Sequence, residues 1–99
     1  MRRYVLTILA QADLAEIASF IRQDSPDAAR RVVKSLRSAM AKLAERPGMG
    51  HIREDLARSS LRFWPVYSYL IIYRPETKPL QILRILHGAR DVRSILEQD

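Results

Sequence analysis

The chain has 99 residues, enough for one small domain but too few for a second hydrophobic core. Apolar residues make up 47% and charged residues 28% of it, a balance typical of a globular protein. There is no cysteine, so disulfide frameworks and thiolate metal sites are excluded, and two separated histidines offer little for a zinc site. We therefore predict a single domain over residues 1–99, with no metal and no cofactor.

Lysine and arginine outnumber aspartate and glutamate by seventeen to eleven, which gives a formal net charge of +6. Most of the seventeen are arginines, whose planar guanidinium favours bidentate contacts to carboxylates or phosphates. This charge indicates an acidic partner, either a nucleic acid or an acidic protein segment; the alternative is a basic solvated surface without a specific partner. The apolar run in the opening MRRYVLTILAQADL is too short for a secretory signal or a membrane span, which predicts a cytoplasmic protein.

The first half of the chain predicts a strand followed by two helices. Residues 3–7 are rich in β-branched and aromatic side chains and predict an opening strand, after which Thr7 can cap a helix that begins at Ile8. Asp13 lies off the apolar face of this helix. That face is formed by residues at helical spacing: Leu14, Ile17, Ala18 and Ile21.

A second helix is predicted from Pro26 to Arg46, with Ser25 as its N-cap. The short connection RQDSPD requires the two helices to form an antiparallel hairpin. Basic residues line a face next to the apolar one, and they indicate either a docking surface or ordinary solvation: Arg30, Lys34 and Arg37. The apolar face itself contains Ala29, Val32, Val33, Leu36, Met40 and Leu43.

The second half predicts three strands after a loop. The loop RPGMGHIRED follows a helix rather than a strand, which argues against a phosphate-binding loop. Strands are predicted over Leu61–Trp64, Val66–Tyr73 and Leu80–His87, and RPETKP is predicted to form a turn. Pro65 either breaks the run between the first two strands or makes a bulge. The order β-α-α-β-β-β gives an α+β fold, in which an antiparallel helical hairpin packs on a small antiparallel sheet with the first strand at one edge.

Four segments in order resemble the ParE-type toxins of the ParE/RelE superfamily. TILAQADLAEIASFI matches the opening pattern T-x-x-A-x-x-D-L-x-x-I, and LAERPGMGHIREDL, LRFWPVYSYLIIYR and LQILRILHGARD follow at the right spacing. The resemblance spans nearly the whole chain. It implies the fold derived above and a bacterial type II toxin (a plasmid stabilisation protein) that is neutralised by direct binding of its antitoxin. The superfamily has two branches: RelE-like toxins cleave messenger RNA on the ribosome, whereas ParE-like toxins are associated with inhibition of DNA gyrase.

An RNase needs groups that activate the 2′-hydroxyl, stabilise the pentavalent phosphate and protonate the leaving oxygen. Arg62 and Arg84, on adjacent predicted strands, could stabilise the phosphate, and His87 is the candidate acid or base. Against this, no tyrosine follows Tyr73, the tail has no aromatic residue to stack on a base, and Asp91 would neutralise a phosphate site. We interpret His87 as the end of a strand that hydrogen-bonds across to the hairpin or to Asp91.

The sequence therefore favours a toxin that inhibits DNA gyrase by binding, without an enzymatic site. The residues predicted to contact gyrase or the antitoxin are Arg62, Tyr73, Arg84, Arg90 and Asp91. One alternative is a RelE-like endoribonuclease that uses His87, Arg62 and Arg84; another is a nucleic-acid-binding module, which would need exposed aromatic residues on the sheet.

The expected partner is a cognate antitoxin with an acidic, amphipathic C-terminal segment. Such a segment would place an apolar face in the groove beside the helical hairpin and add a strand to an exposed sheet edge. Gly88, which follows the last predicted strand, is expected to let the chain turn sharply there.

Overall fold

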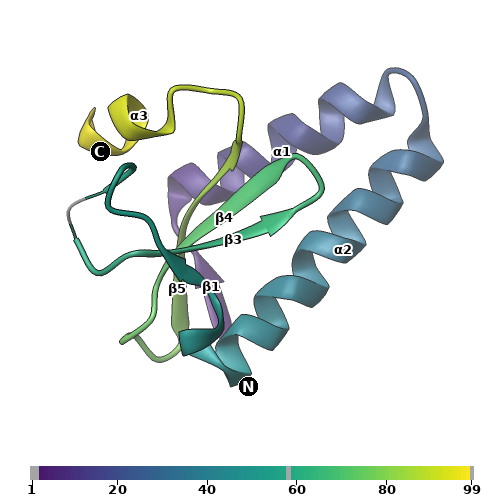
Figure 1. The fold of residues 1–99 in the computed structure, drawn as a ribbon. Helices are drawn as coiled ribbons and strands as arrows, with labels where there is room; N and C mark the ends of the chain where they lie inside the picture. Colours follow the sequence, from purple (N-terminus) through teal and green to yellow (C-terminus); the bar gives the residue numbers. More distant parts are fainter. Residues whose placement is uncertain (1–2, 58, 99) are drawn as a thin grey trace.

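The computed structural model describes residues 3–57 and 59–98, and Figure 1 shows their arrangement. No helix within these two ranges is long and apolar enough to cross a membrane. The elements follow in the order β1 (Tyr4–Leu6), α1 (Ile8–Arg22), α2 (Pro26–Glu45), the short 3-10 helix η1 (Pro47–Met49), β2 (His51–Ile52), β3 (Arg62–Val66), β4 (Tyr69–Arg74), β5 (Leu80–His87) and α3 (Val92–Gln98).

Both long helices begin at the predicted caps. The Thr7 hydroxyl accepts a hydrogen bond from the Ala10 N–H at 3.1 Å, and the Ser25 hydroxyl accepts one from the Ala28 N–H at 3.1 Å. Pro26 is the first residue of α2, a position where its missing N–H would have no intrahelical partner anyway. The two helices pack against each other as the expected hairpin, which confirms this part of the sequence analysis (Figure 1).

The sheet has the order β1-β5-β4-β3-β2. The antiparallel meander of β3, β4 and β5 is confirmed, and so is the place of β1 at an edge. However, β1 pairs with β5 in parallel, with Tyr4 opposite Leu80, so the prediction of an antiparallel sheet is wrong at this edge. A short hairpin can join only antiparallel strands, whereas a long connection also allows parallel pairing, and a long stretch of chain joins β1 to β5.

Strand β3 runs through Pro65 in regular register with β4, so both alternatives predicted there, a break and a bulge, are wrong. Pro65 lies opposite Leu70, and the turn comes later, at Tyr67 and Ser68. The partner strand β2 pairs only with Arg62 and Phe63, so it does not reach Pro65. A proline on an unpaired edge removes no hydrogen bond from the sheet, which explains why the strand continues.

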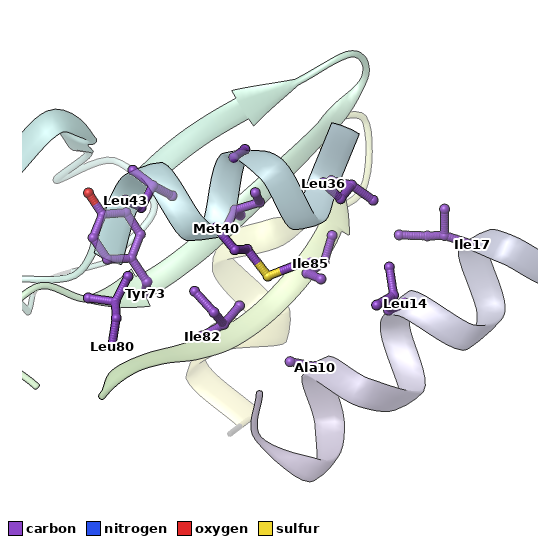
Figure 2. Packing of buried hydrophobic residues seen from close by; sticks show 12 residues of the cluster. Ala10, Leu14, Ile17, Leu36, Met40, Leu43, Tyr73, Leu80, Ile82 and Ile85 are labelled. Carbon is purple, nitrogen blue, oxygen red and sulfur yellow. The ribbon is translucent and has the colours of Figure 1, made fainter. Parts of the chain in front are cut away.

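Apolar side chains fill both faces of the sheet. In β4, Ile71 and Tyr73 belong to the cluster formed with α1 and α2, whereas Ile72 belongs to a second cluster that includes Val92 at the start of α3. Figure 2 shows the larger cluster, where Met40 and Leu43 of α2 lie over the strands. The sheet is therefore covered on one face by the helical hairpin and on the other by α3, a helix that the sequence analysis did not predict.

Candidate functional site

The residues that follow β5 are hydrogen-bonded to the turn between β3 and β4. Gly88 donates its backbone N–H to the carbonyl of Ser68 in the β3–β4 turn at 2.8 Å. His87 is exposed, and its Nδ1 accepts a hydrogen bond from the Ala89 N–H at 3.0 Å. Its ring and that of Tyr69 form a T-shaped contact with 5.5 Å between centroids. Among the hydrogen bonds of the described residues, the imidazole makes neither predicted contact, to the helical hairpin or to Asp91; the bond to the β3–β4 turn comes from the backbone of Gly88.

Asp91 caps the C-terminal helix. Its carboxylate accepts hydrogen bonds from the Ser94 backbone N–H at 3.3 Å and from the Ser94 hydroxyl at 2.8 Å, so the side chain faces the first turn of α3. Arg90, just before it, is exposed. Gly88 does not adopt a positive φ, so the prediction that the turn depends on the conformational freedom of glycine is wrong.

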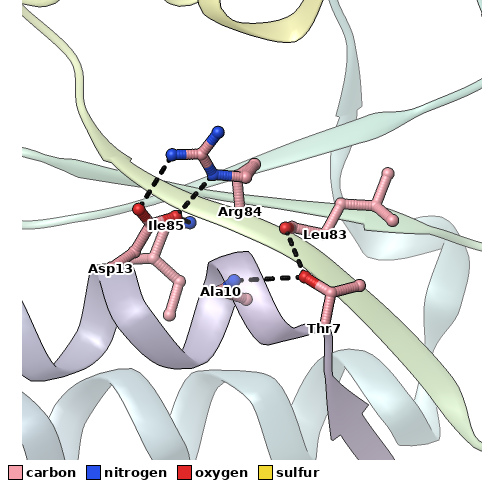
Figure 3. Close-up of polar contacts among 6 residues, drawn as sticks. All are labelled: Thr7, Ala10, Asp13, Leu83, Arg84 and Ile85. Atoms are coloured by element: carbon pink, nitrogen blue, oxygen red, sulfur yellow. Dashed lines mark hydrogen bonds and ion pairs between the residues drawn. The ribbon is translucent and has the colours of Figure 1, made fainter. Parts of the chain in front are cut away.

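Arg84 pairs with Asp13 of α1 inside the protein (Figure 3). Its Nε donates to Asp13 Oδ2 at 2.7 Å and its second terminal nitrogen to Oδ1 at 2.9 Å, while the Ile85 N–H donates to Oδ2 at 3.0 Å. The two side chains are only 12% and 9% exposed. Asp13 was placed off the buried face of α1 by the sequence analysis, and this is wrong, because it anchors α1 to β5.

A bulge in β5 lies beside this ion pair. Tyr73 pairs with Ile82 and Ile72 with Arg84, so Leu83 has no partner on β4. Bulges change the direction of neighbouring side chains, which accounts for the reach of Arg84 toward α1. The Thr7 hydroxyl donates to the Leu83 carbonyl at 2.8 Å, so the residue that caps α1 also holds the bulge.

Tyr73 and Arg62 together hold the loop between α2 and β2. The Tyr73 hydroxyl donates to the Pro47 carbonyl at 2.7 Å and accepts from the Gly50 N–H at 2.9 Å. Arg62 donates to the carbonyls of Gly48 at 3.3 Å and Gly50 at 2.7 Å. A Cβ on Gly50 would lie 2.4 Å from the Tyr73 hydroxyl, so glycine is required there by this close approach.

Burial raises the pKa of Tyr73 above its ordinary value of 10.0, while the Gly50 hydrogen bond and the Arg62 charge act in the opposite direction. The phenol is therefore neutral at physiological pH. In this state it can both donate and accept, as the loop requires.

The predicted site residues thus lie in separate places. Arg62 is on β3 and Arg84 on β5, with β4 between them, so the two arginines are not on adjacent strands as predicted. Tyr73 is fully buried and Arg84 is largely so, which removes both from the exposed surface. Of the predicted contact residues, Arg90 and Asp91 are exposed and Arg62 is partly so.

A groove of about 1370 Å³ runs between α1, α2 and the outer edge of β1. Its lining includes no acidic residue among those the structure describes. The apolar part of the lining comes from both helices: Leu14, Ala15, Ala18, Ala29 and Val33. The basic part comes from the same helices: Arg22, Arg30, Lys34 and Arg37. Arg22 was not singled out from the sequence, although the antiparallel hairpin brings the last turn of α1 next to the first turns of α2.

The outer edge of β1 borders this groove. Arg3 and Thr7 bond to β5 through their backbones, at 2.9 Å to the Leu80 N–H and 3.0 Å to the Ile82 carbonyl. Because backbone groups alternate in direction along a parallel strand, those of Tyr4 and Leu6 face outward. The Leu6 carbonyl accepts a hydrogen bond from the Gln11 side chain at 3.1 Å. This edge can accept another strand once the Gln11 contact is released.

Comparisons with known proteins agree with the fold. The sequence model for the ParE toxin of the type II toxin–antitoxin system parDE matches residues 4–92. Toxin RelE2 of Caulobacter vibrioides is 40% identical over 90 residues, covering 91% of this chain and 99% of the relative. Toxin ParE1 of the same organism is 31% identical over 97 residues, covering 97% of this chain and 99% of the relative.

A solved structure described as the chromosomal ParDE TA system from P. aeruginosa aligns with a TM-score of 0.68 at 23% identity, covering 85% of this chain and 92% of that one. The helical hairpin on a mixed sheet is therefore an arrangement shared with a solved toxin–antitoxin structure. The chain belongs to the ParE/RelE family, the toxins of type II toxin–antitoxin systems.

Proposed function

We propose that this toxin acts in the bacterial cytoplasm by binding DNA gyrase and has no RNA-cleaving site of its own. The observation that supports this is that the two arginines predicted to stabilise the phosphate are engaged by the protein itself and lie on strands that are not neighbours. Arg84 is paired with Asp13, and Arg62 donates to loop carbonyls. Phosphoryl-transfer chemistry requires cationic donors aimed at the phosphate next to a general acid and base, and β4 separates these two arginines.

The proposed partner is an antitoxin with an acidic, amphipathic C-terminal segment that occupies the α1–α2–β1 groove. The apolar floor of the groove suits one face of such a segment, and Lys34 and Arg37 suit its carboxylates. The outward backbone groups of Tyr4 and Leu6 can pair with an extended part of the same segment. The antitoxin would thus use main-chain hydrogen bonds and charge together.

A second candidate function is cleavage of messenger RNA. It is favoured by the 40% identity to a relative named toxin RelE2, together with the exposure of His87 at the end of β5. In this alternative His87 would act as the general acid or base, with Arg90 three residues further along the chain.

A pair of assays on purified toxin separates the two functions: gyrase supercoiling with trapping of the cleavage complex, and cleavage of messenger RNA on translating ribosomes. We expect gyrase to be inhibited, messenger RNA to stay intact, and addition of the antitoxin to restore supercoiling. His87→Ala should leave gyrase inhibition unchanged, with His51→Ala as the matched control. Cleavage of messenger RNA that is lost in His87→Ala and kept in His51→Ala would refute the proposal.

A further inference from the structure

The β3–β4 turn contains a backbone conformation that its residue does not favour. Of the non-glycine residues that the structure describes, Tyr67 alone has a positive φ, at 53°. In this region the Cβ crowds the backbone, so glycine and asparagine are favoured and a bulky aromatic residue is a true outlier. A two-residue hairpin loop of this kind is normally built from such small residues.

The interior of the protein does not require a tyrosine at this position. The Tyr67 side chain is 68% exposed, and its hydroxyl forms a hydrogen bond with the Ser35 hydroxyl of α2 at 3.2 Å. It belongs to neither of the two buried clusters. A strained and exposed aromatic residue is a combination found where function, rather than folding, selects the side chain.

Two hydrogen bonds hold the turn, one from each side, so the Tyr67 ring is already positioned before a partner binds. On one side the Ser35 hydroxyl fixes the phenol, and on the other the Gly88 N–H donates to the Ser68 carbonyl at 2.8 Å. A rigid aromatic side chain loses little conformational freedom on binding, and tyrosine is enriched among the residues that dominate interface energies. The hydrogen bond from Gly88, after β5, therefore stabilises the turn that contains Tyr67.

We infer that Tyr67 is an anchor residue through which the toxin contacts its protein target, in a pocket of the target with an apolar floor and an acidic rim. Both segments that hold the turn carry an exposed arginine: Arg31 precedes Ser35 by one helical turn, and Arg90 follows Gly88 by two residues. Because charges across an interface are complementary in sign, these two arginines favour an acidic rim on the target's pocket. The inference rests on the proposed function, because it takes DNA gyrase as that target.

This surface is separate from the α1–α2–β1 groove. Neither Tyr67 nor Ser35 lines the groove. On α2, Ser35 is five residues after Arg30 and two before Arg37, and at 3.6 residues per turn these spacings place it on the opposite side of the helix from both. A substitution at Tyr67 should therefore weaken binding to the target and leave binding to the antitoxin unchanged.

The test compares Tyr67→Gly, Tyr67→Phe and Phe20→Ala in the gyrase supercoiling assay, by thermal unfolding and by antitoxin titration. Phe20 on α1 is a matched control, since it is 67% exposed. We expect Tyr67→Gly to melt at the same or a higher temperature, to bind the antitoxin within twofold of the unmodified toxin, and to inhibit gyrase at least tenfold more weakly. Phe20→Ala should inhibit within threefold of the unmodified toxin. Tyr67→Phe keeps the ring but loses the Ser35 hydrogen bond, so it should inhibit more strongly than Tyr67→Gly.

Three other outcomes would overturn the inference. Unchanged inhibition by Tyr67→Gly would overturn the inference and leave the proposed function intact. A clear fall in its melting temperature would assign Tyr67 to the fold and overturn the inference as well; Tyr67→Asn, which tolerates positive φ, checks that result with a second residue type. If the unmodified toxin does not inhibit gyrase at all, the proposed function and the inference fail together.

Discussion

Replacing Asp13 by asparagine tests the ion pair that joins α1 to β5. Asparagine keeps the shape of the side chain and an oxygen for the Ile85 N–H, but it removes the charge that faces Arg84. Both partners are nearly enclosed, at 9% and 12% exposure, so water cannot replace the lost contact. Removing one partner of a buried pair leaves an uncompensated charge and costs about 3–5 kcal/mol of unfolding free energy.

Such a loss is large for a domain of this size, whose total stability is on the order of 5–15 kcal/mol. A loss of about 3 kcal/mol lowers the melting temperature by roughly 12–24 °C, at about 4–8 °C per kcal/mol. Thermal and urea unfolding followed by circular dichroism measure both quantities. Glu16→Gln is the matched control, since Glu16 is exposed on the same helix, and it should change stability by less than about 0.5 kcal/mol.

A double mutant separates the pair from the two single changes. Asp13→Asn combined with Arg84→Met removes both charges, and it should cost less than the sum of the single substitutions because no charge is left buried. A cost below about 1 kcal/mol for Asp13→Asn, or additive costs in the double mutant, would refute the reasoning that this pair is a buried structural contact.

Further substitutions test single side chains. Tyr73→Phe should cost about 1–3 kcal/mol, because the Pro47 carbonyl and the Gly50 N–H lose their partner. Since the folded pKa of Tyr73 is raised, its contribution is complete below about pH 10 and is lost as the pH rises through the folded value; urea unfolding above pH 10 should therefore show a steeper loss in the unmodified protein than in Tyr73→Phe. Thr7→Ala should cost about 1–2 kcal/mol in the same assay and Thr7→Ser much less, because serine keeps the cap. Lys34→Glu should weaken antitoxin binding at least about tenfold in titration calorimetry at low salt and less at high salt, whereas Lys42→Glu, outside the groove, should not.

The elements that were predicted correctly carry their signals locally. Thr7, Ser25 and Pro26 mark helix starts by capping chemistry that depends on three or four neighbouring residues. The apolar face of α2 is visible from its spacing, and its central residues are buried as expected. The meander of β3, β4 and β5 is likewise a matter of adjacent strands joined by short turns.

The features that were missed depend on distant contacts. Helical periodicity predicts Asp13 to be a surface residue. Its carboxylate can be buried because it pairs with Arg84, which lies 71 positions away in the sequence. The helix α3 is seven residues long, and helices this short are stable chiefly through packing, here of Val92 against the sheet. The bulge at Leu83 and the positive φ of Tyr67 are likewise set by the register of the finished sheet, which no local pattern encodes.

The arginines differ in how far contacts within the protein already engage them. A net charge of +6 counts every arginine equally, yet Arg84 is paired with a carboxylate and Arg62 is held by two carbonyls. Both side chains are therefore already engaged by contacts within the protein. The groove between α1 and α2 instead gathers basic side chains over an apolar floor, with no acidic residue in the described lining. If the antitoxin segment is acidic, as we propose, its carboxylates find their complement on the helical hairpin rather than at Arg62 or Arg84.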